Sequence, residues 1–310
     1  MTLGALSVRP ESSRRFLGLL VACLCFFATS RAHAETVDAT GAGATTSSDA
    51  SEPPKLYWQW RKSPPLEYVA TGLVGVGALG VFFLLKPQAT PHWNSGILFD
   101  NAVRKTFRLH SPSGRDAART FSNVTAITTL VLAVGVDSVL LPLVKKSPNV
   151  IEELLLIDAE ALALNSLATT ITFDEVGRAR PSYDDCKRNR NVDPLCNSGN
   201  TASFFSGHES QAFTAAGLSC AHHQYLKFYG GGAPDTLSCI GNLTVAAGTG
   251  ALRILGDRHY ATDVLTGALV GFGFGYGMPV LLHYSFRAER ANVSVVPFGR
   301  GLGIDASGTF

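Results

Sequence analysis

The stretch Arg253-Ile-Leu-Gly-Asp-Arg-His-Tyr-Ala-Thr-Asp263 carries an arginine, a histidine and an aspartate in the spacing R-x5-H-x3-D. If the chain is helical from Asp257 onward, His259 and Asp263 lie one turn apart on the same face. A carboxylate there holds the imidazole by one ring nitrogen and leaves the other free as a nucleophile or base. Gly256 is expected to end the preceding helix. A His–Asp pair facing an arginine suits phosphoryl chemistry, although a chance pair on a helix surface has the same spacing.

A second stretch, Phe205-Ser206-Gly207-His208-Glu209, is expected to begin a helix. Ser206 and Glu209 have the S-x-x-E spacing of a capping box, so Ser206 is the expected N-cap. The amide groups of Gly207 and His208 then point at an anion, with the helix dipole behind them. His208 lies on the first turn, where it is placed to give a proton to a leaving oxygen.

A third stretch, Gly177-Arg178-Ala179-Arg180-Pro181, is expected to end the helix before it. Arg180 and Arg253 supply forked guanidinium donors for the same oxyanion. Each stretch by itself has an ordinary structural explanation, as a capped loop or a helix end. Together, and in this order, they indicate one site for a phosphate group.

The three stretches resemble the motifs of the type 2 phosphatidic acid phosphatase (PAP2) family, which shares a fold with vanadium haloperoxidases and bacterial acid phosphatases. The family pattern is K-x6-R-P, then P-S-G-H, then S-R-x5-H-x3-D, and the resemblance covers roughly residues 66–285. It implies an all-α six-helix bundle, membrane-embedded or membrane-associated, and an enzyme that needs no cofactor or metal. It also implies that His259 is the nucleophile, that Asp263 orients it and that His208 protonates the leaving group. The phosphate would be held by Arg180, Arg253, Ser206 and the amide of Gly207.

Three positions depart from the family motifs. Phe173 stands in place of the lysine, Phe205 in place of the proline and Leu252 in place of the serine. Losing one charged donor from an oxyanion site costs on the order of 2–4 kcal/mol of transition-state stabilisation. Arg178 is expected as an auxiliary replacement for the lysine, although it and Arg180, two residues apart, do not share a helix face. All the residues assigned to bond making are present.

Composition places the chain between soluble and membrane proteins. Of its 310 residues, 46% are hydrophobic and 16% are charged, which is apolar for a soluble protein. The length fits one large domain or two modest ones. A net charge of +2 gives no sign of nucleic-acid binding.

The N-terminus has the features of an export signal. Arg14 and Arg15 precede the apolar run Phe16–Phe27, and Ala32-His33-Ala34 offers a cleavage site. A lipoprotein signal ending at Cys23 and an uncleaved anchor are the alternatives. The expected parts of the chain are a signal peptide (1–34), a disordered linker (35–54), a PAP2-like phosphatase domain (55–286) and a C-terminal tail (287–310).

Four of the six cysteines lie beyond the signal. In an exported chain they indicate two disulfides. Cys186 and Cys196 flank a polar loop and are expected to pair, which leaves Cys220 with Cys239. Free buried thiols are the alternative, more so for the second pair.

Apolar patterning predicts about six helices and no convincing sheet, with a short hairpin or a loose end in the tail. The strongest transmembrane candidate is Leu66–Leu85. The other helices are either spans that meet through small residues or core helices of an exported bundle. If every helix spanned after a cleaved signal, the Cys186–Cys196 loop would lie in the cytoplasm, where disulfides do not persist. We therefore expect the site on the oxidising side and leave the number of spans open.

Several polar residues interrupt the apolar helices. Asp137, Asp158 and Glu160 have the character of a polar relay, but hydrogen bonds between helices or solvent exposure explain them better. The adjacent His222 and His223 lack a fitting second ligand pair, so no metal site is predicted there.

The sequence therefore predicts a metal-independent phosphatase of the cell envelope. It would hydrolyse phosphomonoesters or pyrophosphates through a phosphohistidine at the extracytoplasmic side. Lipid phosphates are the expected substrates because the helices are apolar, and a small phosphate ester is the fallback. The protein would be exported, either within the membrane with its site facing the periplasm or periplasmic and membrane-associated. A vanadate-dependent haloperoxidase and a non-catalytic lipid-phosphate binder, the latter suggested by Phe173, are the alternatives.

Overall fold

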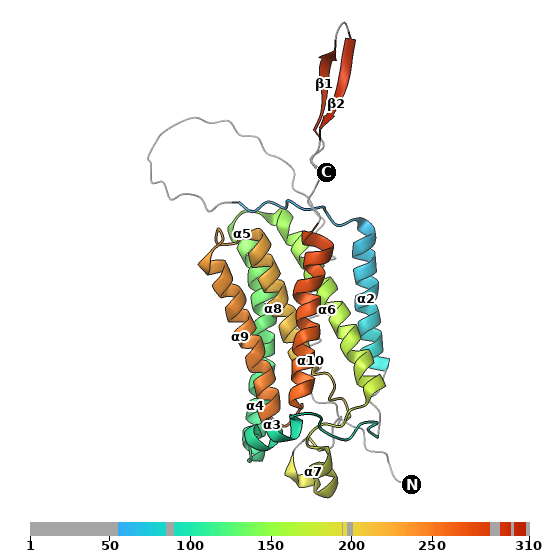
Figure 1. The fold of residues 1–310 in the computed structure, drawn as a ribbon, viewed down its shortest axis with the longest axis vertical. Coiled ribbons are helices and arrows are strands. Elements are labelled where there is room, and N and C mark those ends of the chain that lie inside the picture. The colour runs from blue at the N-terminus through green and yellow to red at the C-terminus, as the bar shows by residue number, and fades with distance from the viewer. Residues whose placement is uncertain are drawn as a thin grey trace, which may run out of the picture. The chain divides into compact units, whose positions relative to one another are not determined.

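Six long helical segments form a bundle in the computed structural model (Figure 1). The structure describes residues 55–84, 90–193, 195–196, 201–285, 292–298 and 301–307, so the predicted signal peptide and linker lie outside it. The first four segments are α2 (Pro65–Leu84), α4 (Pro112–Leu130) continued by η2 (Val131–Leu140) and α5 (Leu141–Val144), α6 (Pro148–Val176) and α8 (Gly207–Leu226). The last two are α9 (Ala233–Leu255) and α10 (Ala261–Phe272), which continues through η4 (Gly273–Gly277) and η5 (Val280–Tyr284). The predicted all-α six-helix bundle is confirmed.

Shorter elements lie at the ends of these segments. Helices α3 (Asp100–Phe107) and α7 (Tyr183–Arg188) lie at one end of the bundle and α5 at the other (Figure 1). A single 3₁₀ turn, η3 (Arg190–Val192), follows α7. In the tail, β1 (Asn292–Phe298) and β2 (Gly301–Ser307) pair as an antiparallel hairpin.

Helix α8 is the central helix of the bundle. It packs against α4, α6, α9 and α10, and almost every residue from Glu209 to His223 is buried. Its many alanine, serine and glycine residues let the neighbouring helices approach closely. The weak apolar pattern of this segment therefore has a simple cause: α8 faces protein on all sides.

Helix α10 and its continuation approach α8 through glycines spaced one turn apart. A Cβ atom at Gly271 would overlap the carbonyl oxygen of Ser210, and one at Gly275 would overlap the carbonyl oxygen of Thr214. Only glycine permits backbones to lie this close. These contacts hold the end of α10 and the segment η4 against the first half of α8.

Four of the six segments are long and apolar enough to cross a membrane: Pro65–Leu84, Pro112–Val144, Pro148–Val176 and Ala261–Tyr284. Large apolar side chains cover their outer faces, including Leu73 and Val76 on α2 and Leu269 on α10. Such a surface suits lipid rather than water. The chain is therefore a membrane protein, and the part that the structure describes has four candidate spans.

Both predicted disulfides are present in the structure. Cys186 of α7 pairs with Cys196, and Cys220 of α8 pairs with Cys239 of α9. The free-thiol alternative is not observed. Two disulfides fit an exported location. That the end of the bundle with the predicted site faces the oxidising side stays a prediction.

Buried polar groups between the helices pair with one another. Nε2 of His222 lies 2.9 Å from Asp158. His223 lies between two carboxylates, 2.7 Å from Asp235 and 3.2 Å from Asp137. Asp137 and Asp158 thus make hydrogen bonds between helices, which is the interpretation that the sequence favoured. The two histidines contact different carboxylates.

Replacing Gly271 with alanine is expected to destabilise the bundle by roughly 1–3 kcal/mol, because the added methyl group overpacks the contact with α8. Gly273→Ala is the matched control, since a Cβ there has no neighbour within 4 Å. Thermal unfolding of the two purified variants in detergent checks this, and equal midpoints would contradict the packing argument.

Candidate active site

The three predicted stretches meet at the end of the bundle that carries α7. Arg180 follows α6, which ends before a left-handed Gly177 with φ of 53°. The stretch around Ser206 leads into α8. The backbone N–H of Ser206 donates to the backbone carbonyl of Asp263, 3.0 Å away. Nη1 of Arg180 lies 3.3 Å from Nε2 of His259. Residues 79 positions apart in the sequence, Arg180 and His259, thus share one site.

The helix that carries Asp263 begins at Ala261, later than the predicted start at Asp257. Gly256 caps α9 as predicted, but Asp257 then takes a left-handed φ of 57°. His259 therefore lies before the helix, and its Nδ1 is 3.9 Å from the nearer carboxylate oxygen of Asp263. That distance is too long for a hydrogen bond, so the direct His–Asp bond expected from one-turn spacing is not formed.

Ser203 connects the histidine to the aspartate instead. Its carbonyl oxygen accepts a hydrogen bond from Nδ1 of His259 at 2.8 Å, and its hydroxyl donates to Asp263 at 2.7 Å. Because a carbonyl can only accept, Nδ1 carries the ring proton and Nε2 presents its lone pair toward Arg180. Ser203 could not be predicted from the motifs, since it lies outside them and contributes a backbone carbonyl.

Arg178 lies behind the site and is completely buried. Its guanidinium donates to Asp100 at 2.7 Å and to Asp263. It also lies over the rings of Trp93 and Tyr260, 4.0 and 4.3 Å from their centroids. This placement does not agree with the auxiliary phosphate contact expected of Arg178, because its charge is taken up by two carboxylates.

Asp100, on α3, is the second residue that the motifs did not reveal. Burial acts to raise its pKa, but hydrogen bonds from the amides of Thr262 and Ile97 and from Arg178 outweigh burial and hold the pKa below its usual value. Asp100 is therefore ionised and balances the buried guanidinium.

Ser206 precedes α8 as predicted, but the predicted capping box is not formed. Its hydroxyl is buried without a hydrogen-bond partner. Glu209 turns toward Gly250 on α9, where burial raises the pKa of its carboxyl to about 9. A capping box forms on α10 instead, where Asp263 accepts the N–H of Tyr260.

Three arginines surround the two site histidines. Burial and then the positive charges of Arg180, Arg253 and Arg258 hold the pKa values of His208 and His259 well below the usual range. Both imidazoles are therefore neutral near pH 7. Nε of Arg253 and Nη1 of Arg258 are buried without hydrogen-bond partners. In the motif R-x5-H, Arg258 is one of the five residues between Arg253 and His259, to which the motif gives no role. Its place directly before His259 is the one feature of the sequence that points to a position in the site.

Phe173 contacts the start of α8. A Cβ atom at Gly207 would lie 3.2 Å from the Cζ atom of Phe173 and 3.0 Å from the methyl group of Thr169. Phe173 stands at the position where the family motif has a lysine, and its ring thus covers Gly207. The contact leaves no room for a larger residue at 207.

Residues 154–287 match the family model of the PAP2 superfamily. This match supports membership of the PAP2 superfamily. The matched part includes every site residue predicted from the motifs. No curated protein and no solved structure matches the chain. PAP2 membership supports a phosphoester hydrolase activity in general, and the candidate spans fit a membrane-associated phosphate ester substrate.

Replacing Arg178 with methionine is expected to destabilise this PAP2 protein by about 3–5 kcal/mol, because it leaves two buried carboxylates without their cation. Arg188→Met is the matched control, since the Arg188 side chain is 77% exposed and makes only a surface ion pair. Denaturant unfolding measures both. Similar losses in the two variants would show that the buried ion triad does not hold the site together.

Proposed function

We propose that the chain is a metal-independent phosphatase that hydrolyses lipid phosphates through a phosphohistidine intermediate at the extracytoplasmic side of the membrane. The observation that carries this proposal is a set of buried, unpaired hydrogen-bonding atoms beside two neutral histidines. These atoms are Ser206 Oγ, Arg253 Nε and Arg258 Nη1. Buried polar atoms without partners are rare in native proteins, and a bound phosphate would supply acceptors for all three.

The reaction begins with attack of His259 Nε2 on phosphorus, from the side that faces Arg180. The bond from phosphorus to the leaving oxygen breaks as the N–P bond forms, and His208 gives its proton to that oxygen. A water molecule then attacks the phosphohistidine and loses a proton to His208, which releases phosphate and restores both histidines. Ser203 keeps the attacking nitrogen unprotonated throughout, because its carbonyl holds the proton on Nδ1.

The low pKa of His208 is consistent with this role. In the empty site the imidazole is neutral, since burial and the arginines both oppose a charge on it. A phosphate dianion reverses the local electrostatics and favours the imidazolium. Substrate binding therefore favours the protonated form of His208, which is the form that acts as the general acid.

Arg258 takes the place of the missing lysine in this proposal. Phe173 puts an apolar ring where the family has a cation, whereas Arg258 contributes positive charge to both histidines and has an unpaired Nη1. The number of cations around the phosphate is thus maintained. This argues for turnover rather than for binding without catalysis.

Lipid phosphates are favoured as substrates by the position of the site. It lies at one end of a bundle whose outer faces carry exposed apolar side chains. The headgroup phosphates of lipids lie at this depth, at the surface of the hydrocarbon layer. Such substrates would reach the site by diffusion within the membrane.

His259→Ala is expected to lower the turnover of a lipid phosphate by roughly 10³-fold or more, because it removes the nucleophile. The exposed His110 provides the control, and His110→Ala should remain fully active. A panel of lipid and soluble phosphate esters, assayed for turnover by phosphate release and for an initial burst of the leaving alcohol, tests both the role and the substrate class. Full activity of His259→Ala would contradict the proposal.

Arg258→Met is expected to lower kcat by about 10²- to 10³-fold, the loss typical of one oxyanion donor. Arg258→Lys should recover part of the lost kcat, because lysine restores the positive charge but not the forked donors of the guanidinium. Arg190→Met, on an exposed residue, serves as the control. If kcat of Arg258→Met equals that of the control, Arg258 does not replace the lysine.

A further inference from the structure

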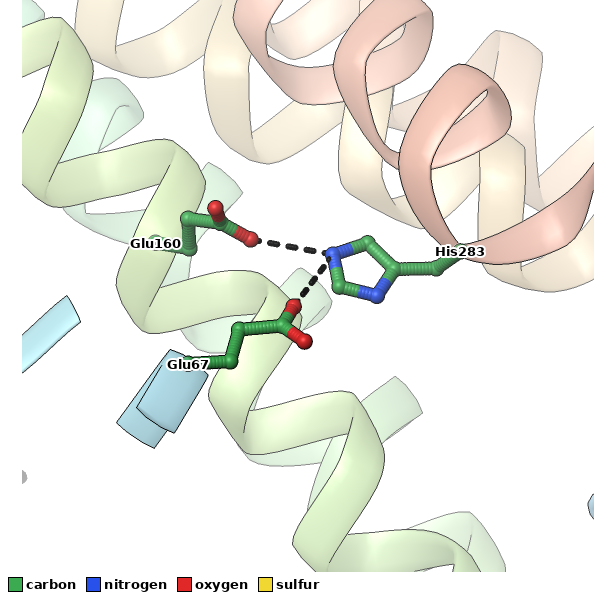
Figure 2. Close-up of side chains that lie close together, drawn as sticks. All are labelled: Glu67, Glu160 and His283. Atoms are coloured by element: carbon green, nitrogen blue, oxygen red, sulfur yellow. Dashed lines mark hydrogen bonds and ion pairs between the residues drawn. The ribbon is translucent and has the colours of Figure 1, made fainter. Parts of the chain in front are cut away.

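Glu67, Glu160 and His283 come together in the half of the bundle away from α7. Glu67 lies in the first turn of α2, Glu160 on α6, and His283 in η5 near the end of the last helical segment. Figure 2 shows both carboxylates directed at the same ring nitrogen of His283. Because the three residues come from separate helices, no spacing in the sequence indicates this cluster.

The distances within the cluster suit a common ligand. Nε2 of His283 lies 2.9 Å from Glu160 and 3.5 Å from Glu67, and the three ligand atoms lie within 4.8 Å of one another. Around a tetrahedral ion with bonds of about 2.0–2.1 Å, neighbouring ligand atoms are roughly 3.4 Å apart. Small side-chain movements would therefore place all three atoms around one ion.

The charges of the cluster also favour a bound cation. The main charged neighbours of Glu67 are His283, Glu160 and Glu153, and no lysine or arginine is among them. Glu153 is bonded to the backbone N–H of Ser63. Two carboxylates that converge on one imidazole between apolar helices repel each other. One divalent ion would neutralise both and leave the imidazole neutral, as a ligand must be.

We propose that Glu67, Glu160 and His283 bind a divalent transition-metal ion, with zinc as the best match. An imidazole nitrogen with two carboxylates favours this class over calcium or magnesium, which prefer oxygen ligands alone. The side chain of His283 is only 4% exposed, whereas those of Glu67 and Glu160 are 25% and 16% exposed. The imidazole is thus fixed, and one side of the cluster is open for the ion to enter and for water to complete its shell.

The ion would fasten α2 to the rest of the bundle. Among the described elements, α2 packs chiefly against α6, and the contact of Glu67 with His283 links it also to the last segment. A metal held by all three helices would replace a long and weak ion pair by coordinate bonds. The site is structural and is independent of the proposed phosphatase site at the other end of the bundle.

The test uses the purified full-length chain without a histidine tag, stripped with a chelator. Zinc titration is expected to show one tight site per chain and a higher unfolding midpoint. Cobalt, used as a spectroscopic probe, should give the visible absorption of a four- or five-coordinate ion. Glu160→Gln and Glu67→Gln should each weaken zinc binding by at least about 100-fold, since each removes a direct ligand.

Glu175→Gln is the matched control, because it changes an exposed glutamate on the same helix. It should bind zinc as the unaltered chain does. The proposal is overturned if no saturable zinc site appears, or if Glu160→Gln binds as tightly as Glu175→Gln. In the first case a shared proton, rather than a metal, holds the cluster together. Phosphatase turnover of the two ligand variants, measured in parallel, should be unchanged at low temperature.

Discussion

The ion triad Asp100–Arg178–Asp263 is the constraint on which the proposed site depends. A buried guanidinium is stable only when nearby carboxylates balance its charge, and here the two ion pairs of Arg178 join α3, the segment after α6 and the start of α10. Asp263 passes this order on, because it accepts from Ser203, whose carbonyl holds His259. The orientation of the proposed nucleophile is thus set two contacts away, by groups that never face the substrate.

The other carboxylates around the site are also paired with arginines. Two further carboxylates near Arg258, those of Asp193 and Asp257, are held by arginines from α4 and from α3 and its C-cap. The pairs are Arg115 and Arg119 with Asp193, and Arg104 and Arg108 with Asp257. The acids are therefore neutralised in an outer layer. The positive charge that acts on His208 and His259 is left to attract an anion.

The helix pattern was predictable from the sequence, because apolar runs of this length and glycines at helix ends act locally. Both cysteine pairs followed from their number and spacing. The start of α10 was not predictable, since it depends on the left-handed turn at Asp257. The same holds for Ser203 and Asp100, which act through a backbone carbonyl and a distant helix. The ion pairs of Arg178 were not predictable either, because a sequence shows that a cation is near a motif but not which way it points.

The junction of α8 and α10 joins two of the motifs through the backbone rather than through their side chains. The N–H of Ser206 donates to the carbonyl of Asp263 at 3.0 Å, and a Cβ at Gly267 would lie 2.7 Å from the carbonyl oxygen of Ser206. The two motifs are therefore joined backbone to backbone, at a separation that only glycine allows. Side chains beside this junction can change without moving it. The apolar ring of Phe173 lies beside this junction, at Gly207, and leaves the backbone link between the two motifs in place.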